Sequence, residues 1–281
     1  MKKGFIITAV LFILAGLALF SYAFVGAGVD FSKLSAVKHE TNTYTVAENF
    51  EKIEIDTDET DVILKPSENG KFSVVCAERE KVRHTVTVEN GVLKIGCMDN
   101  RAWYEHLTFF TKPLSMTVYL PADHYETLKI HNSTGDIRVP ASFSFSGIDL
   151  QVSTGDIVCD ASAEKIVQLK TSTGNVRLSD VRAQQFSLSV STGNIRLKNT
   201  VAADLLDIHS STGDVRLDNC DAGQIKVKTS TGDVTGTLQS EKIFVTKSST
   251  GSIRVPQTVS GGKCEIITST GDIEISISDT F

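Results

Sequence analysis

Residues 209–220 read HSSTGDVRLDNC, and the Ser-Thr-Gly in this stretch decides the fold because it recurs along the chain. A catalytic serine or a phosphate-binding loop is needed once, whereas eight copies indicate architecture. A fixed period of 19 or 20 residues is typical of stacked repeats. The repeats end at Gly135, Gly155, Gly174, Gly193, Gly213, Gly232, Gly251 and Gly271.

Apolar and polar residues alternate on both sides of each repeat glycine. Around Gly213 the apolar positions are Leu206, Ile208, Val215 and Leu217, and the other copies are similar. A period of two predicts short strands with one buried face. One strand enters and one leaves each corner, where glycine tolerates a positive φ or a close backbone approach.

One such repeat cannot bury its apolar face, but stacked repeats can, because equivalent residues fall into columns about 4.8 Å apart. We therefore expect an all-β fold, a single-stranded β-solenoid with about 19–20 residues per rung. Residues 121–281 would form its regular part. The last rung, around Gly271, has no evident cap, so its C-terminal edge is a candidate site of self-association.

The pattern in residues 49–120 is rougher, and we expect this segment to begin the stack and to cap its end. Asp61-Val62 occupy the place of a later Gly-Asp-Val, and Asn90-Gly91 predicts a hairpin. An aromatic stretch in the same segment is a candidate contact with a partner or a membrane. Its residues are Trp103, Tyr104, Phe109 and Phe110.

The N-terminus carries two lysines and then an uncharged run at 4–28. About 20 apolar residues suffice to span a membrane as a helix, so 1–28 is predicted to be an anchor and 29–48 a polar linker. The alternative is a signal peptide cleaved near SYA at 21–23. In both cases the lysines stay inside, and the remainder is expected outside the cytoplasm.

Charge and cysteine content exclude some classes of protein. A net charge of −6, with no basic block except Lys2-Lys3, argues against a nucleic-acid partner. The five cysteines fit no zinc spacing, and an odd number leaves at least one thiol unpaired within the chain. Cys159, Cys220 and Cys264 fall in or beside apolar columns and are expected to be buried. Whether Cys76 and Cys97 pair remains open.

No constellation of residues points to catalysis. His131 and His209 share an outward column four rungs apart, about 19 Å at the strand spacing. No Gly-x-Ser-x-Gly is present. We expect neither enzymatic activity nor a cofactor.

Two sets of polar side chains recur beside the corner. Aspartate or asparagine follows most of the glycines, which suggests either calcium ligands or hydrogen bonds to the backbone of the corner. Arginines three places after the glycine face outward and suit an anionic polymer, or else form a salt-bridged solvated surface. This arginine stripe comprises Arg138, Arg177, Arg196, Arg216 and Arg254.

The stretch LSMTVYLPADHYETLKIHNSTGDIRV at 114–139, followed by repeated STGDV and STGNI, resembles the bacterial putative-adhesin family of β-strand repeats, a domain of unknown function. The likeness covers roughly residues 49–281. It implies a β-solenoid displayed on the cell envelope, and some relatives are linked with envelope-stress response systems. The family has no agreed catalytic residues to transfer.

These observations predict a non-enzymatic, single-pass protein of the bacterial cell membrane with an extracytoplasmic solenoid. The solenoid would act as an adhesin-like surface or as a scaffold in envelope-stress sensing. The alternative is a binder or processing enzyme of anionic envelope polysaccharide. The expected partners are the membrane, through the N-terminal helix, and an envelope protein or polysaccharide.

Overall fold

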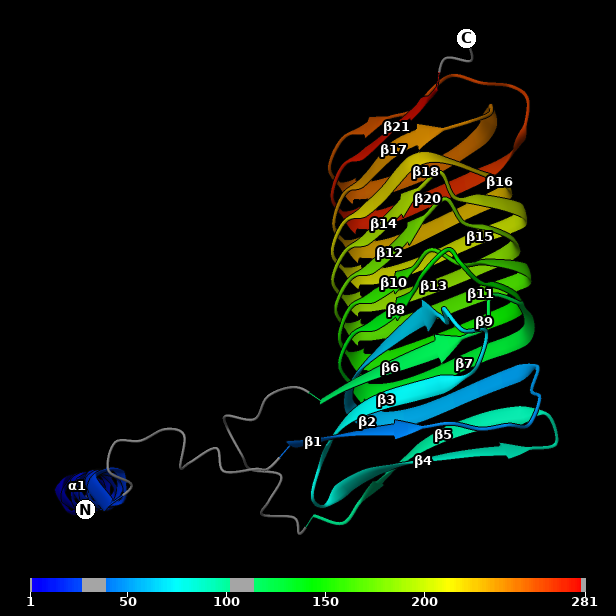
Figure 1. Cartoon of the computed structure of the whole chain (residues 1–281). Coiled ribbons are helices and arrows are strands. Elements are labelled where there is room, and N and C mark those ends of the chain that lie inside the picture. The colour runs from blue at the N-terminus through cyan, green and yellow to red at the C-terminus, as the bar shows by residue number, and fades with distance from the viewer. Residues whose placement is uncertain (1, 27–38, 102–113, 279–281) are drawn as a thin grey trace. The chain divides into compact units, whose positions relative to one another are not determined.

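The computed structural model describes residues 2–26, 39–101 and 114–278, and it is nearly all β (Figure 1). The N-terminal helix α1 covers Lys2–Gly26. Among the described residues, no helix has the length and apolar character needed to cross a membrane, so the predicted span is not shown. The helix and the strands belong to separate compact units.

Six strands precede the regular rungs. They are β1 (His39–Tyr44), β2 (Lys52–Pro66), β3 (Ser73–Arg79), β4 (Val82–Glu89), β5 (Val92–Asp99) and β6 (Leu114–Leu120). The rungs then run through β7 (His124–Thr134), β8 (Ile137–Val139), β9 (Ser144–Thr154), β10 (Ile157–Cys159), β11 (Ser162–Thr173), β12 (Val176–Ser179), β13 (Arg182–Thr192), β14 (Ile195–Lys198), β15 (Val201–Thr212) and β16 (Val215–Thr231). The last strands are β17 (Val234–Leu238), β18 (Lys242–Thr250), β19 (Ile253–Arg254), β20 (Gly262–Thr270) and β21 (Ile273–Ile277).

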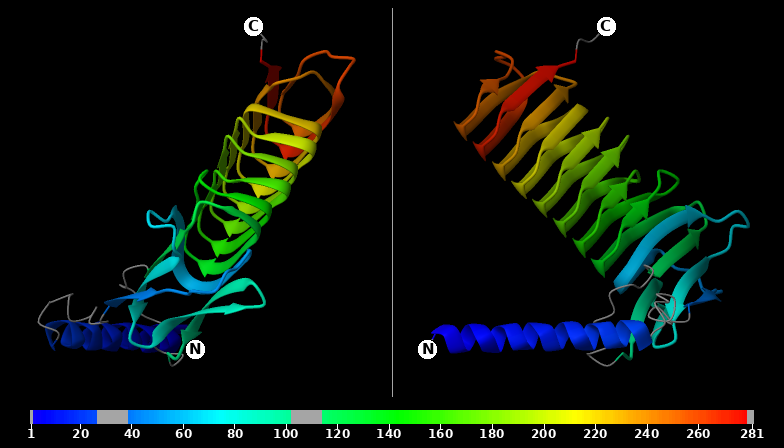
Figure 2. Two further views of the ribbon diagram at one scale, coloured as in Figure 1. Left: turned by 45° about the vertical axis from the view of Figure 1, so that its right-hand side comes forward. Right: turned by 90° about the vertical axis from the view of Figure 1, so that its left-hand side faces the viewer.

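Parallel pairing between successive rungs builds the solenoid, as the stacked arrows of Figure 2 show. Ile137 lies opposite Ile157, which lies opposite Val176, and the next partner is Ile195. These partners are the residues two places after successive glycines. The predicted β-solenoid is therefore confirmed, with equivalent residues in register along its columns.

The stack begins earlier in the chain than the first Ser-Thr-Gly. Strand β2 pairs in parallel with β7 and β8, and Val62 lies opposite Ile137, so the predicted degenerate rung is confirmed. On its other side β2 pairs with β5 and β6. Strands β3 and β4 then add antiparallel partners to β6 and β5. The predicted hairpin is also formed, with Glu89 opposite Val92.

The order of the final rungs differs from the order of the sequence. Strand β20 pairs with β16 on one side and with β18 on the other, and β21 lies likewise between β17 and β19. The rung of Gly271 is thus inserted between the rungs of Gly232 and Gly251. In the right view of Figure 2 an orange strand accordingly lies nearer the end of the stack than the red strand that follows it in the sequence.

The terminal edge is therefore formed by β18 and β19 rather than by the last rung of the sequence. Ile253 is 41% exposed there, whereas its neighbour in the column, Ile273, is fully buried. This corrects the expectation that the rung of Gly271 forms the open edge. Self-association through the terminal edge remains a prediction, now placed on β18 and β19.

The core is a continuous apolar column inside the rungs, which extends from Ile53 to Ile275. Cys159, Cys220 and Cys264 are buried free thiols within it, as predicted. Burial raises the pKa of Cys159 to about 12, which keeps the thiol protonated and unreactive. Cys76 is a buried free thiol as well, so it is not paired with Cys97.

Candidate interaction surface

The repeat glycines have a structural role that their geometry explains. All eight adopt φ between 129° and 152°, where side chains are strained. At Gly193 a Cβ atom would lie 2.0 Å from the carbonyl oxygen of Gly174 in the next rung. The corners therefore stack backbone on backbone, and glycine is required by that close approach.

The polar residue after each glycine forms a ladder along the rod. The Oδ1 atom of Asp136 accepts the backbone N–H of Asp156, whose Oδ1 accepts that of Asn175. The same bond recurs at every rung from Asp61 to Ser252, with N···O distances of 2.7–3.0 Å. We name this series the Asx ladder. Its side chains bond to the neighbouring rung, which gives aspartate and asparagine a shared structural role at this position.

The arginine stripe is not continuous. Val158 separates Arg138 from Arg177, because it lies opposite both. At the other end, Thr235 and Glu274 lie between Arg216 and Arg254. Only three arginines are direct neighbours in the column. They are Arg177, Arg196 and Arg216.

The five arginines also differ in their ion pairs. Arg138 bonds to Asp136 at 2.9 Å, and Arg254 lies 3.6 Å from Glu274 of the adjacent rung. Arg216 donates from Nε to both oxygens of Asp218, at 2.8 and 2.9 Å. Within the described part of the chain, Arg177 and Arg196 have no carboxylate partner.

A shallow depression of about 580 Å³ lies near the open end of the rod, between β16, β17, β19 and β21. Arg216 and Arg254 line it together with their partners Asp218 and Glu274. Its mixed charge and wide opening give it no marked preference for an anionic or a cationic ligand.

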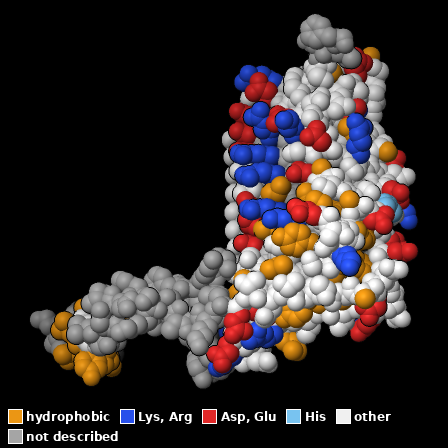
Figure 3. Space-filling view, in the orientation of Figure 1, with side chains coloured by type: hydrophobic (Ala, Val, Ile, Leu, Met, Phe, Trp, Pro, Cys, Tyr) orange, Lys and Arg blue, Asp and Glu red, His pale blue; other side chains and the backbone are white. Residues whose placement is uncertain are grey.

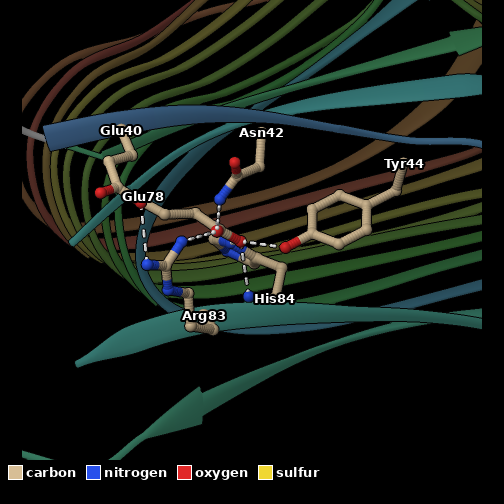
Figure 4. Close-up of polar contacts among 6 residues, drawn as sticks. All are labelled: Glu40, Asn42, Tyr44, Glu78, Arg83 and His84. Atoms are coloured by element: carbon tan, nitrogen blue, oxygen red, sulfur yellow. Dashed lines mark hydrogen bonds and ion pairs between the residues drawn. The ribbon is translucent and has the colours of Figure 1, made fainter. Parts of the chain in front are cut away.

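A buried polar cluster joins β1 to the turn between β3 and β4 (Figure 4). The Glu78 carboxylate accepts hydrogen bonds from Asn42 at 2.5 Å, from the Tyr44 hydroxyl at 2.9 Å and from the His84 amide at 2.7 Å. His84 Nδ1 lies 3.0 Å from the same carboxylate, and Arg83 lies 3.3 Å from it.

The cluster shifts two pKa values. Burial by itself would raise the pKa of Glu78, but the hydrogen bonds from Asn42, His84 and Tyr44 outweigh it and lower the pKa. Burial lowers the pKa of His84, against the opposing effect of Glu78. The stable form is therefore a charged carboxylate beside a neutral imidazole.

The same cluster contains a set of donor atoms that could hold a metal ion. Atoms of Cys76, Glu78 and His84 lie within 4.8 Å of one another, and all three residues are buried. Both Glu78 oxygens are already occupied by hydrogen bonds, so an ion would have to displace them. The arrangement is explained by its role in tying β1 to the neighbouring strands.

Sequence reasoning did not find the Glu78 cluster, because its residues are scattered over three strands and match no motif. Asn175 and Asn194, in contrast, were visible as departures from the aspartate of the other repeats. The aromatic candidates Trp103, Tyr104, Phe109 and Phe110 lie outside the described residues.

The family model described as Toastrack DUF4097 matches residues 50–257 and 201–281, and the chain belongs to this family of unknown function. No curated protein matches.

Solved structures share the fold. One described as a putative adhesin from Bacteroides fragilis has 16% identity and a TM-score of 0.53, over 86% of this chain and 97% of its own. One of the same description from Parabacteroides distasonis has 14% identity and a TM-score of 0.56, over 86% and 98%. A third, described as a putative lipid binding protein from Parabacteroides distasonis, has 12% identity and a TM-score of 0.51, over 87% and 98%.

Proposed function

We propose that this chain is a non-enzymatic protein of the bacterial cell envelope whose solenoid presents an adhesin-like interaction surface, or serves as a scaffold in envelope-stress sensing. The observation that supports this proposal is the structural role of the repeated residues. The glycines, the Asx ladder and the apolar columns all hold the rungs together. The outward face of the strands is what remains available to a partner. The adhesin description of two structural neighbours supports this proposal.

Attachment to the membrane through residues 1–28 belongs to the same proposal and is supported by the sequence. Fractionation of cells expressing the full chain, followed by alkaline carbonate extraction and N-terminal sequencing, tests it. An anchored chain stays in the membrane pellet with its N-terminus intact. A chain cleaved near 21–23 is soluble and starts beyond that site, and a cytoplasmic chain contradicts the proposal.

The interaction itself is tested by capture from envelope fractions of the source bacterium, with retained proteins and glycans identified separately. The tagged full chain in non-ionic detergent is compared with a heat-denatured sample of the same chain. Selective retention of an envelope component by the folded chain supports the proposal. Equal retention by both samples, or none from any fraction, contradicts it.

A second candidate function is binding of an anionic envelope polysaccharide, and the run of Arg177, Arg196 and Arg216 favours it. Guanidinium groups match carboxylate and phosphate by bidentate geometry. Replacing these three arginines together by serine should abolish retention of the polymer. Unchanged retention would remove the stripe from consideration.

A further inference from the structure

Two arginines of the stripe, Arg177 and Arg196, have no ion pair within the described residues. They lie in the two rungs whose Asx-ladder residue is an asparagine. In the first regular rung, Asp136 both supports the ladder and neutralises Arg138 two residues later. In the rungs of Gly174 and Gly193 the ladder residue is Asn175 or Asn194. An amide oxygen accepts the same backbone N–H but carries no charge. In these two rungs the ladder is kept, but no ladder carboxylate lies beside the arginine as Asp136 lies beside Arg138. Arg216 in the next rung pairs with Asp218 and not with its ladder residue Asp214.

These two rungs are adjacent, so their cations gather in one place. Arg177 lies opposite Arg196, which lies opposite Arg216. Lys198, two residues after Arg196, is also exposed, and Asp218, which lies opposite it on β16, is ion-paired with Arg216. In Figure 3 Lys and Arg side chains gather over β12 and β14 at the edge of the solenoid. We name Arg177, Arg196 and Lys198 the cationic strip.

We propose that the cationic strip is a binding site for a linear anionic polysaccharide or polyol-phosphate chain that lies along the axis of the rod. This inference rests on the second of the proposed functions and assigns its site. The arginines repeat at the strand spacing of about 4.8 Å, which presents positive charge in a line rather than over a plane. Each arginine can form paired bonds to one carboxylate or phosphate group of the ligand.

The borders of the strip favour a narrow ligand over a lipid surface. Asp156 and Asp214 occupy the ladder positions on either side of the two asparagines, and Asp180 and Asp218 lie next to the strip along the strands. A single polymer chain can follow the cations between these carboxylates. A broad anionic membrane surface would also be repelled by these carboxylates and by the chain's net charge of −6.

Restoring the missing carboxylates tests the site. Asn175→Asp with Asn194→Asp keeps the ladder acceptor, as at Asp136 and Asp156, and removes the 3.0 Å bond that Asn175 Nδ2 donates to Asp156 Oδ1. Binding of polygalacturonate and of polyphosphate to the full chain in non-ionic detergent should weaken roughly fivefold for each introduced carboxylate at low salt. Neutral dextran serves as the uncharged control, and circular dichroism verifies the fold.

A matched pair of arginine variants separates the strip from the rest of the stripe. Arg177→Gln with Arg196→Gln changes only exposed side chains and should abolish polyanion binding. Arg254→Gln removes an arginine that is already paired with Glu274 and should leave binding unchanged. Equal losses in both variants would overturn the assignment. Preference for polygalacturonate or for polyphosphate identifies the anionic group of the ligand.

Other outcomes separate this inference from the proposed functions. Polyanion binding that survives both Asn→Asp changes places the site elsewhere and overturns the inference, while polysaccharide binding stands. Binding to phosphatidylglycerol vesicles without binding to either polymer also overturns it. Capture of an envelope protein without any polyanion binding overturns this site and the polysaccharide function together, and leaves the adhesin-like proposal intact.

Discussion

A side chain at a repeat corner should disrupt the stack. In Gly193→Val the new Cβ would lie 2.0 Å from the Gly174 carbonyl oxygen and would require φ near 140°. We expect a loss of stability of roughly 3 kcal/mol or more, since neither the backbone strain nor the clash can be relieved locally.

Thermal unfolding with Gly147→Ala as the control checks this prediction. Gly147 has an ordinary φ, and its added Cβ would contact only Ile166, at 3.9 Å. The control should melt close to the parent chain. An unchanged melting temperature for Gly193→Val would show that the corner is not as tightly stacked as the structure indicates.

Acidification should destabilise the Glu78 cluster. The lowered pKa of Glu78 contributes stability that is present above its unfolded pKa and is lost as pH falls through the folded pKa. The lowered pKa of His84 acts in the same direction, because the unfolded chain takes up a proton first below about pH 6.5. Stability should therefore decline from neutral pH to pH 3, through His84 below about pH 6.5 and through Glu78 below about pH 4.5.

Melting temperatures of the parent chain and of Glu78→Gln across this range test the assignment. At neutral pH the variant should lose about 3 kcal/mol, because Arg83 and the other donors lose their charged acceptor. Below about pH 4.5 it should also show a flatter pH dependence, because the carboxyl group that takes up the proton is absent. Parallel curves for the two proteins would mean that other groups dominate the acid sensitivity.

At the scale of elements, the unexpected order of the last rungs has a physical reason. The rung of Gly251 places Thr246 where the rung of Gly271 places Ile266. With this order Thr246 rather than Ile266 lies at the open edge, although Phe244 lies there in place of Cys264. Ile266 and Ile275 are accordingly buried inside the stack.

Two equivalent truncations distinguish the observed rung order from the order of the sequence. Ile273→Ala removes a fully buried side chain and should cost about 3 kcal/mol, while Ile253→Ala at the open edge should cost less than about 1 kcal/mol. Chemical denaturation of the two variants measures the difference. The opposite ranking would place the rung of Gly271 at the end of the rod.

For the whole molecule, each rung contacts only the rungs on either side of it, so stability should vary along the axis. Hydrogen exchange should be slowest in the central rungs between Val176 and Val215 and fastest in β18 and β19. Mass spectrometry of peptides along the chain checks this gradient. Uniform protection would indicate that the rod opens only as a unit.

The sequence was sufficient for the solenoid because period-two alternation and a fixed repeat length together determine which residues share a column. It was insufficient for the rung order, since the rungs of Gly251 and Gly271 have similar patterns and both can stack on that of Gly232. The candidate site shows the same difference between what the sequence could and could not predict. The arginines were visible, but Glu274 lies between Thr235 and Arg254 only because the rungs are reordered.

The reordered rungs also constrain the time at which the rod can be completed. Protein chains are synthesised from the N-terminus, so β18 and β19 exist before the rung that connects them to the stack. They have no permanent neighbour until residues 262–277 arrive and insert between them and Val234. The distal end thus assembles after translation of its last residues, as a single event. A chain interrupted shortly before its C-terminus would retain an open core and a detached strand, which proteases could recognise as unfinished.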